Sequence, residues 1–497
     1  MKRAINALVA VLATVAMAVA GFMGAGTAFA DEANTITGPK NGHTYEAYQI
    51  FTGDLADGKL SNVKWGSATA KNGTAVTDAE LKTVTDLASK SVNDNAQATA
   101  NAIAAYLTSD AQPTATIDDT NPTAQVPSGY YLIKDKNNTV PDGQAATTYI
   151  VTVAGNVSIT PKSDVPSFEK KLKDTNDTTG ETSDWQDSAD YDINDAVPFK
   201  LEGTVASNYA DYDTYYFAFH DVEENSLTFN KDSVKVYVDD TEITSGYSVV
   251  TEGLADGCTF EVEFADLKRI SAVKAGSKIR VEYTSTLNEN AVLGKHGNVN
   301  KAKLQFSNNP NDSQNGETSP TGETPWDNVI VFTYKTVINK VDDEDRPLKG
   351  AEFTLSKKMK DGSTRSVAVV KDGEGTTFTF NGLDDGDYVL SETVTPAGYN
   401  KIDDITFTVT ANHAIEWDGT GRTDVLTSLS GDKKSGSAEF TMTASKADGS
   451  LISSVVNKPG SSLPETGGMG TIVLYAAGAV LVIVAGVYFG LKKKNAR

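Results

Sequence analysis

The C-terminal end of the chain constrains the fold more than any other feature of the sequence. An uncharged apolar run from Thr471 to Gly490 is followed by a tail that carries four basic residues. A helix of about 20 apolar residues can cross a bilayer, and the basic tail would hold its end on the cytoplasmic side. The rest of the chain is therefore expected to fold outside the membrane, on the N-terminal side of this span.

A pentapeptide stands just before the apolar run, and it reads Leu463-Pro464-Glu465-Thr466-Gly467. Motif, span and basic tail together resemble the cell-wall sorting signal of Gram-positive surface proteins, which a sortase reads. The resemblance implies cleavage between Thr466 and Gly467 and transfer of the Thr466 acyl group to an amine. The alternative is an ordinary membrane anchor with an accidental pentapeptide, and it requires all three features to coincide in the right order.

The opposite end of the chain predicts export. Basic residues at the start precede an apolar stretch from about Ile5 to Met23, and a small-x-small sequence ends at Ala30. These are the parts of a secretory signal peptide. We expect cleavage after Ala30 and a mature chain that begins at Asp31.

Composition limits the partners and the chemistry. The formal net charge of -22 argues against nucleic acid, whose phosphates require basic patches. Cys258 is the only cysteine, so no disulfide can form within the chain, and we interpret it as a small buried apolar residue. The four histidines show no ligand spacing, and no nucleophile elbow, metalloprotease motif or phosphate loop occurs. We therefore predict no enzyme, no cofactor and no metal site.

Short strands separated by turn residues predict a mainly β fold of tandem Ig-like β-sandwiches. The first region adds two predicted helices, at 78–90 and 94–107, where apolar residues have helical spacing. The segment 308–327 is rich in turn-forming residues and is interpreted as a loop. We expect a signal peptide at 1–30, three domains at 31–165, 166–334 and 335–460, and the anchor at 461–497.

A weak internal repeat links the first and third domains. The segment 126–135 echoes the segment 383–392, so that Asp135 aligns with Glu392. We interpret the two domains as sandwiches of one lineage.

Three polar side chains of the third domain are expected to face its core. Lys340, Glu392 and Asn457 lie on three different predicted strands. Each is two residues away from an apolar residue of its own strand, so its side chain lies on the same face of the strand as that apolar residue. They are costly to bury unpaired, so we expect them to meet. Desolvation favours the neutral amine and the neutral acid. A neutral Lys340 could then attack the Asn457 carboxamide, polarised by a protonated Glu392, and form an isopeptide bond with loss of ammonia.

Two segments of this domain resemble a known family. Residues 387–399 resemble the glutamate-containing box of Gram-positive pilins, and residues 337–342 resemble the first strand of their C-terminal CnaB-type domain. The resemblance implies an isopeptide bond between Lys340 and Asn457, promoted by Glu392. The alternative is a conventional hydrogen-bonded salt bridge with an exposed Asn457.

The second domain repeats the pattern of core-facing polar residues. Lys170, Asp221 and Asn300 each continue an apolar strand face, and the alternation selects Lys170 over Lys171. By resemblance to pilin middle domains of the CnaA type, they are the lysine, the catalytic aspartate and the asparagine of a second isopeptide bond. Asn298 lies close enough in sequence to compete with Asn300.

The first domain departs from this pattern. Asp135 aligns with Glu392, but the predicted strand 45–51 offers no lysine, and we predict no isopeptide bond there. In the third domain, the acidic cluster 342–345 could bind a cation such as calcium. An exposed hairpin turn is favoured, because the cluster lacks calcium-loop spacing.

A proline-flanked lysine, Lys162, stands between the first two domains. Pro161 and Pro166 keep this stretch stiff and out of a helix. The segment resembles the pilin motif, whose Pro-Lys pair presents the amine that attacks the sortase acyl-enzyme, although Thr160 stands where that family often has an aromatic residue. The alternative is a solvated linker lysine.

From signal peptide to basic tail, the chain is similar to major (backbone) pilins of the SpaA/SpaH-like, LPXTG-anchored type. The resemblance implies a shaft subunit in which a class C-type pilin sortase joins Thr466 of one copy to Lys162 of the next. A housekeeping sortase would attach the fibre to peptidoglycan, and accessory pilins and host surface ligands are further expected partners. The alternative is a monomeric wall-anchored adhesin that uses the same domains as a stalk.

Overall fold

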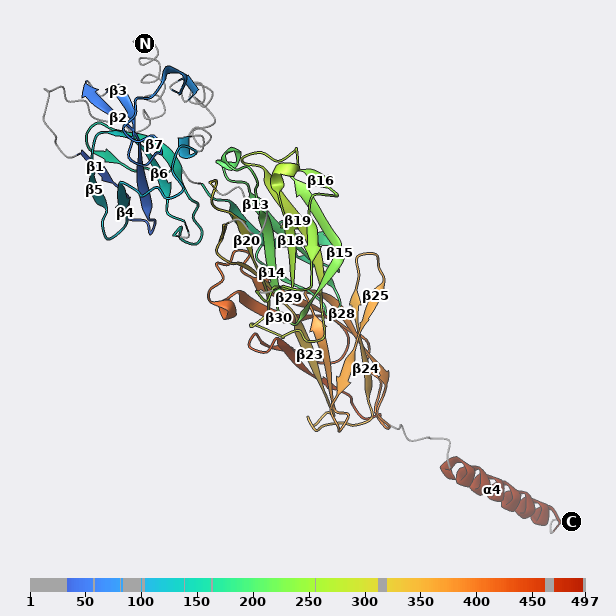
Figure 1. Cartoon of the computed structure of the whole chain (residues 1–497). Helices are drawn as coiled ribbons and strands as arrows, with labels where there is room; N and C mark the ends of the chain where they lie inside the picture. The colour runs from blue at the N-terminus through green and yellow to red at the C-terminus, as the bar shows by residue number, and fades with distance from the viewer. Residues whose placement is uncertain are drawn as a thin grey trace.

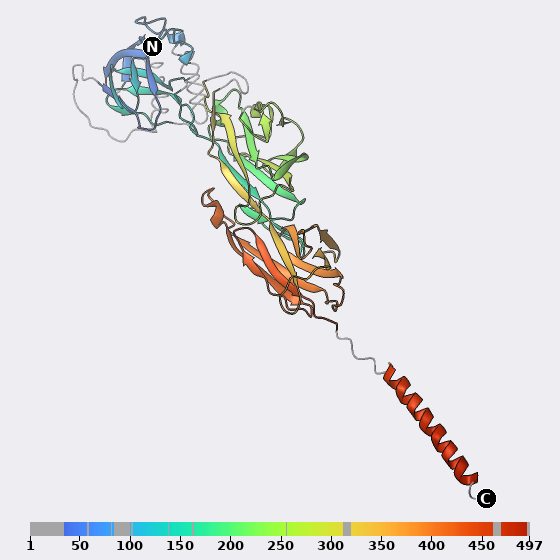
Figure 2. The same cartoon turned by 90° about the horizontal axis from the view of Figure 1, so that it is seen from below.

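The computed structural model describes residues 34–56, 59–80, 82–83, 100, 103–137, 139–161, 164–254, 256–311, 320–460 and 469–494. These residues form three groups of strands that follow one another along an elongated molecule, with a helix at the C-terminal end (Figure 1, Figure 2). The prediction of a mainly β chain with tandem domains is confirmed.

The N-terminal strand group contains two sheets. The larger has the order β3-β2-β6-β7 with β4 beside β2, and the smaller has the order β5-β1-β8. Alternate side chains of β2 enter different cores, because Tyr45 packs with Ile36 on one side and Tyr48 packs with Trp65 on the other. The strands are β1 (Asn34–Thr37), β2 (Tyr45–Ala56), β3 (Lys59–Trp65), β4 (Ala115–Ile117), β5 (Thr123–Val126), β6 (Gly129–Asp135), β7 (Thr148–Val153) and β8 (Val157–Ser158).

The first predicted helix begins with a capping box. Thr77 Oγ1 accepts from the Glu80 amide at 3.3 Å, and the Glu80 carboxylate accepts from the Thr77 amide at 2.8 Å. Helical residues follow at 78–80 and 82–83, and again at 100 and 103–104. Most of the predicted helices 78–90 and 94–107 lies outside the described residues.

The middle strand group is a sandwich of two sheets. One sheet has the order β12-β22-β20-β14-β18-β17 with β21 beside β20, and the other has the order β16-β15-β19-β13-β9. Their facing sides bury a core rich in aromatic rings, among them Phe199, Phe219 and Tyr283. The strands are β9 (Ser167–Leu172), β12 (Ser188–Asp190), β13 (Ala196–Thr204), β14 (Phe217–Glu223), β15 (Leu227–Val238), β16 (Thr241–Ile243), β17 (Ser248–Val250), β18 (Phe260–Phe264), β19 (Lys278–Leu287), β20 (Asn298–Ser307), β21 (Thr321–Glu323) and β22 (Asp327–Phe332).

One strand of this group was not expected. The short strand β21 lies inside the segment 308–327, which the sequence predicted as a loop. It pairs with β20 through three residues, including Gly322 opposite Phe306. A Cβ at Gly322 would stand 3.2 Å from the Phe306 ring, so a residue without a side chain suits this close approach.

The C-terminal strand group is a second sandwich. Its sheets have the orders β26-β27-β23-β32-β31 and β25-β24-β28-β29-β30, and its core gathers Phe353, Phe378, Tyr388 and Phe407. The first and last long strands, β23 and β32, lie side by side in parallel. The strands are β23 (Tyr334–Val341), β24 (Glu352–Lys358), β25 (Thr364–Val367), β26 (Val369–Lys371), β27 (Thr377–Leu383), β28 (Gly386–Val394), β29 (Ile405–His413), β30 (Leu426–Ser435), β31 (Thr443–Ser445) and β32 (Ser450–Val456).

The first and third groups share a strand topology. In each, the first strand pairs in parallel with the last one: β1 with β8 and β23 with β32. In each, the central strand of the other sheet lies between an earlier and a later neighbour, as β6 does between β2 and β7 and β28 between β24 and β29. The two halves of the predicted sequence repeat include these central strands.

The middle and C-terminal groups meet through a network of charges. The buried Lys357 lies 3.2 Å from Asp177 and 3.1 Å from Asp192, both of the middle group. Arg365 pairs with Asp177 and Asp195 at 2.6 Å. Because the cations come from one group and the carboxylates from the other, these contacts fix the two groups against each other.

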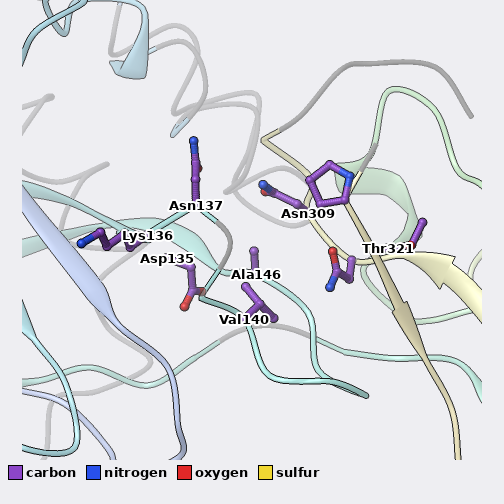
Figure 3. Close-up of a pocket in the computed structure, with 9 residues that line it drawn as sticks. Asp135, Lys136, Asn137, Val140, Ala146, Asn309 and Thr321 are labelled. Atoms are coloured by element: carbon purple, nitrogen blue, oxygen red, sulfur yellow. The ribbon is translucent and has the colours of Figure 1, made fainter. Parts of the chain in front are cut away.

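A smaller contact joins the N-terminal and middle groups. The Ala146 amide donates to the Asn308 carbonyl at 2.6 Å. Beside it lies a pocket of about 200 Å³, with Asp135 and Asn137 on one side and Asn309 and Thr321 on the other (Figure 3). This pocket therefore belongs to the junction between two domains.

The helix α4 (Met469–Lys494) follows the strand groups. The segment Ile472–Lys493 is long and apolar enough to cross a membrane, and its large apolar side chains are exposed in the structure. This agrees with the membrane span predicted at 471–490.

Candidate functional site

The middle group buries the three residues that the sequence singled out. Lys170 lies on β9 opposite Leu201, Asp221 lies on β14 opposite Ala302, and Asn300 lies on β20. All three side chains have no exposed surface. Since β9 belongs to one sheet and β14 and β20 to the other, the cluster bridges the two layers of the sandwich.

A tyrosine hydroxyl connects the cluster. Lys170 Nζ donates to Asp221 Oδ2 at 2.5 Å and to Tyr283 Oη at 2.7 Å. Tyr283 Oη donates to Asp221 Oδ2 at 2.7 Å and accepts from Asn300 Nδ2 at 2.9 Å. The hydroxyl thus touches the amine, the acid and the amide at once.

Burial shifts the charges of this cluster towards neutrality. Burial lowers the pKa of Lys170, although the Asp221 charge opposes the shift. Burial raises the pKa of Asp221, although Lys170 opposes that shift. Burial and the nearby Asp221 charge also raise the pKa of Glu223 to about 8. Burial therefore favours the neutral forms of the amine and of both acids.

The structure shows which of the neighbouring lysines and asparagines belong to the buried cluster. Lys171, next to Lys170, points the other way and pairs with Asp187 at 2.6 Å. Asn298 is buried like Asn300, but its amide binds backbone groups, accepting from the Val292 amide at 2.8 Å and donating to the Val331 carbonyl at 3.0 Å. Asn298 is therefore held in a structural role, and Asn300 alone of the two contacts the cluster.

Sequence reasoning missed two members of the cluster, Tyr283 and Glu223. Tyr283 lies in the core-facing register of β19, where an aromatic residue predicts only packing. Glu223 lies opposite Asn300, and its Oε1 accepts a hydrogen bond from Asn300 Nδ2 at 3.4 Å. Glu223 follows Asp221 on the same face of β14, and that two-residue spacing was the signal that could have indicated it.

The C-terminal group also brings its three predicted residues together. Lys340 lies on β23 beside Val455 of β32, and Asn457 follows β32 by one residue. Asn457 Nδ2 donates to Glu392 Oε1 at 2.9 Å and to Oε2 at 3.2 Å. Lys340 Nζ donates to the Val341 and Val455 carbonyls at 2.7 and 3.0 Å. Lysine and asparagine therefore stand on neighbouring strands of one sheet, with the acid supplied by the other sheet.

The environment of this cluster suits a nucleophilic amine. Burial lowers the pKa of Lys340 to about 8, against the charges of Glu392 and Asp342. Lys340 and Asn457 have no exposed surface and Glu392 is 1% exposed. Among the described residues, Asn457 Oδ1 has no hydrogen-bond partner. Leaving a buried amide oxygen unpaired is costly and so calls for an explanation.

Glu392 contacts the amide nitrogen of the Asn457 carboxamide. The sequence predicted an acid that polarises this carboxamide, without specifying which of its atoms the acid contacts. The Glu392 carboxylate is held by the Thr395 hydroxyl at 3.0 Å and the Ile402 amide at 3.2 Å. This orientation places the acid next to the group that would leave.

The first domain has an acid at the aligned position with other partners. Asp135 accepts from His43 Nδ1 at 2.6 Å and from the Thr147 amide at 2.6 Å. By topology, the strand equivalent to the lysine-bearing β23 is β1, whereas the sequence comparison used 45–51. Like 45–51, β1 contains no lysine.

The acidic cluster at 342–345 forms a turn. Asp342 accepts from the backbone amides of Glu344 and Arg346 at 2.9 Å, and Arg346 Nε donates to its second oxygen at 2.9 Å. Asp345 adopts a positive φ of 59°, as turn residues do. The favoured hairpin-turn interpretation accounts for these contacts without a cation.

The two positions predicted to form the polymer, Lys162 and the pentapeptide Leu463–Gly467, lie outside the described residues. Nearby, the Thr160 amide donates to Tyr149 Oη at 3.1 Å, which ties the start of the linker to the N-terminal group.

Two segments match known families. Residues 334–423 match the SpaA prealbumin-like fold domain, and residues 455–496 match the LPXTG cell wall anchor motif. The chain carries a SpaA domain and an LPXTG anchor. Because the anchor match includes both Leu463–Gly467 and the whole of α4, the chain is a cell wall-anchored surface protein.

A curated protein similar to this chain is a streptococcal surface protein. The trypsin-resistant surface T6 protein of Streptococcus pyogenes serotype M6 is 26% identical over 287 residues, which cover 55% of this chain and 50% of that protein. The chain thus matches about half the length of this curated relative.

Solved structures of pilins align along most of the chain. The T6 backbone pilin of Streptococcus pyogenes serotype M6, a modular three-domain structure, aligns with a TM-score of 0.51 and 18% identity over 87% of this chain and 100% of that one. The major pilin SpaD from Corynebacterium diphtheriae aligns with a TM-score of 0.48 and 20% identity over 86% and 98% of the two chains. The likeness to T6 shows that this chain has the fold of a backbone pilin.

Proposed function

We propose that this chain is the shaft subunit of a covalent cell-surface pilus, internally cross-linked by Lys170–Asn300 and Lys340–Asn457 isopeptide bonds. The observation that carries the proposal is that two successive domains each bury a lysine, an acid and an asparagine together. A fibre must transmit tension, and this chain has no disulfide to do so. A covalent tie between β-strands would carry the load.

The cross-linking reaction needs no cofactor. Nζ of the lysine attacks Cγ of the asparagine, the new Nζ–Cγ bond forms, the Cγ–Nδ2 bond breaks, and the amine proton departs with Nδ2 as ammonia. In the third domain, Glu392 lies against Nδ2 of Asn457 and can pass that proton to the leaving group. The reaction occurs once per site, so the chain is a structural protein and not an enzyme with turnover.

The middle domain offers a similar proton path. Asp221 contacts the Lys170 amine directly, and Tyr283 connects both groups to Nδ2 of Asn300. Asp221 would take the amine proton, and the tyrosine hydroxyl would hold the amine and the amide in register. Asp221 is thus the acid of this site, and Tyr283 is a positioning residue.

Intact mass of the purified chain tests the internal bonds. Each bond removes one ammonia, about 17 Da, so two bonds should remove about 34 Da. Asp221→Ala and Glu392→Ala should each restore about 17 Da beyond the substitution itself, and tandem fragments should place the remaining bond in the other domain. Unchanged mass deficits in both variants would contradict the acid-assisted mechanism.

Polymer formation is tested separately. We propose that sortase joins Thr466 of one copy to Lys162 of the next, since Lys162 stands in a proline-flanked linker between domains. Lys162→Ala should remove the high-mass ladder from a denaturing gel of cell-wall extract, while Lys136→Ala, an exposed lysine of the same domain, should keep it. A normal ladder from Lys162→Ala would exclude this residue as the acceptor.

The competing function is a monomeric wall-anchored adhesin with the same domains as a stalk. It predicts the same internal bonds and the same anchor but no ladder in the unmodified strain. Lys162 favours the pilus, because a monomeric stalk has no use for an acceptor amine.

A further inference from the structure

Four potential metal ligands converge on the outer face of the middle domain, although the sequence predicted no metal site and a buried apolar Cys258. Cys258 is only partly buried and contacts Asp256, because strand pairing and the segment before β18 bring distant residues together. The four ligands are His220 on β14, Glu261 on β18, and Asp256 and Cys258 in the segment before β18. One donor atom from each lies within 4.8 Å of the others. His220 and Glu261 are directly opposite each other in the β14–β18 pairing, so the sheet fixes the positions of two of the four ligands.

Gln305 fixes the orientation of the histidine ring. Its amide nitrogen donates to Thr321 Oγ1 at 3.1 Å, which leaves its oxygen to accept from His220 Nε2 at 3.2 Å. The lone pair of His220 Nδ1 then points into the cluster. A hydrogen bond of this kind on the outer nitrogen is typical of metal-binding histidines.

The His220 ring nitrogen that enters the cluster faces two carboxylates. His220 Nδ1 lies 2.8 Å from Asp256 Oδ2 and 3.2 Å from Glu261 Oε1. The Cys258 thiol donates to Asp256 Oδ2 at 3.0 Å, and the Cys258 backbone amide donates to Asp256 Oδ1 at 3.2 Å. Two acceptors at such distances repel unless the ring takes a second proton or a cation lies between them. A metal ion would satisfy all four groups together.

The separations suit a tetrahedral ion. Zn²⁺ bonds of about 2.0 Å to nitrogen or oxygen and 2.3 Å to sulfur put ligand atoms roughly 3.2–3.7 Å apart. The four recorded separations run from 2.8 Å, between His220 and Asp256, to 3.6 Å, between His220 and Cys258. The remaining two separations are within 4.8 Å, so side-chain adjustments of about 1 Å or less would admit the ion.

We propose that His220, Asp256, Cys258 and Glu261 form a site for Zn²⁺ or a similar divalent transition metal. The mixed nitrogen, sulfur and oxygen set favours such an ion over Ca²⁺ and Mg²⁺, which prefer oxygen alone. Binding releases the thiol proton to solvent, because the thiolate is the ligand. The site opens into a pocket of about 380 Å³ that Glu252 and Glu263 also line, and their charge would attract a cation.

The metal would brace the outer side of the strand that carries the cross-linking acid. His220 precedes Asp221 on β14, so the two side chains leave the strand on opposite faces. The proposed ion ties β14 to the segment before β18 outside the sheet, while Asp221 acts inside it. The proposal does not depend on the isopeptide bonds, since the metal ligands take no part in them.

Metal binding is tested on the untagged full chain in detergent. After incubation with Zn²⁺ and gel filtration, we expect one equivalent of zinc per chain by mass spectrometry, and Co²⁺ should give a thiolate-to-cobalt charge-transfer band. His220→Ala and Cys258→Ser should weaken binding at least tenfold, and Gln305→Ala about tenfold through the lost outer hydrogen bond. His296→Ala, an exposed histidine outside the cluster, should bind as the unmodified chain does.

A second measurement does not rely on variants that have to fold. Cys258 is the only thiol, so its alkylation by iodoacetamide can be followed by intact mass, and Zn²⁺ should slow it at least tenfold. Absence of stoichiometric zinc, or an alkylation rate that Zn²⁺ leaves unchanged, would overturn the proposal in favour of a protonated His220 bridging the two carboxylates. Equal loss of binding in His296→Ala would show adventitious surface binding and would also overturn it.

Discussion

The first and third domains place an acid at the same point of the same topology, yet surround it differently. Asp135 ends β6 and Glu392 lies near the end of β28, each six residues after the glycine that starts its strand. Glu392 contacts the Asn457 amide. Lys340 lies on β23, which pairs with β32, the strand that Asn457 follows. Asp135 instead binds His43 and a backbone amide.

The comparison shows that a shared topology with a buried acid does not imply the same chemistry. Both domains bury the acid, at 4% and 1% exposure for Asp135 and Glu392, so burial alone does not create a reactive cluster. What differs is the pair of strands at the chain ends of each domain, because β1 carries no lysine and β23 carries Lys340. The proposed cross-link therefore requires the lysine that β23 carries and β1 does not.

The largest expected effect is the loss of the proposed cross-link in the third domain. Glu392→Ala should leave Lys340 and Asn457 unjoined and opens a covalent loop of about 120 residues, which by analogy with a disulfide removes about 4–5 kcal/mol of stabilisation. Intact mass should rise by about 17 Da beyond the substitution, and trypsin should cut this domain sooner. Asp135→Ala is the matched control in the first domain, and a mass change beyond the substitution there would show that the two domains react alike.

The next effect concerns the buried amine of an unlinked third domain. In Asn457→Ala, Lys340 still experiences the Glu392 charge but has no amide to attack, and its folded pKa of about 8 lies below its usual 10.5. Between these values the unfolded chain binds more protons, so the free energy of unfolding should rise with pH, by roughly 3 kcal/mol across the window. Below pH 8 the buried amine is charged in the folded state, so the folded domain is destabilised by the full cost of burying that charge.

Hydrogen exchange of β23 peptides at pH 7.5 and 10 measures this rise, after correction for the intrinsic exchange rate. Adding Lys340→Met to Asn457→Ala is the control, since it removes the titrating group and should flatten the dependence. A rise of the same size in the control would assign it to other groups.

A smaller effect tests the acid of the first domain. Asp135→Ala leaves the buried His43 ring and the Thr147 amide without their acceptor, which should cost about 1–3 kcal/mol. Exchange of β6 and β7 peptides should speed up accordingly, while exchange in the third domain stays unchanged. Unaltered protection of β6 would mean that Asp135 has no structural role.

The smallest effect is a pH dependence of opposite sign in the first domain. Burial lowers the pKa of His43, but the hydrogen bond and charge of Asp135 outweigh it, so the folded pKa is raised above 6.5. This stabilisation is fully present below pH 6.5 and is lost as the pH rises through the folded pKa. Protection of β6 should therefore fall on moving from pH 6 to pH 8, and Asp135→Ala should remove the dependence. A rise in protection would reverse the assigned sign.

Several site residues followed from period-two alternation alone. It selected Lys170 over Lys171, because only alternate side chains of β9 enter the core. Alternation could not choose between Asn298 and Asn300, which share a face, and the choice came from the backbone partners that hold Asn298. Tyr283 escaped notice because a tyrosine on a core face predicts packing, and its hydroxyl becomes informative only beside Lys170 and Asp221.

The sequence by itself determined the C-terminal anchor and the β-rich character of the domains before it. Length, apolarity and charge are local properties, so both could be predicted without a fold. The signal peptide predicted at 1–30 lies outside the described residues and stays a prediction. The tertiary structure alone decided which distant residues meet. His43 joins Asp135, and His220 joins Cys258, only because strand pairing and loop closure bring them together. Such contacts depend on how sheets stack, and no spacing along the chain encodes that.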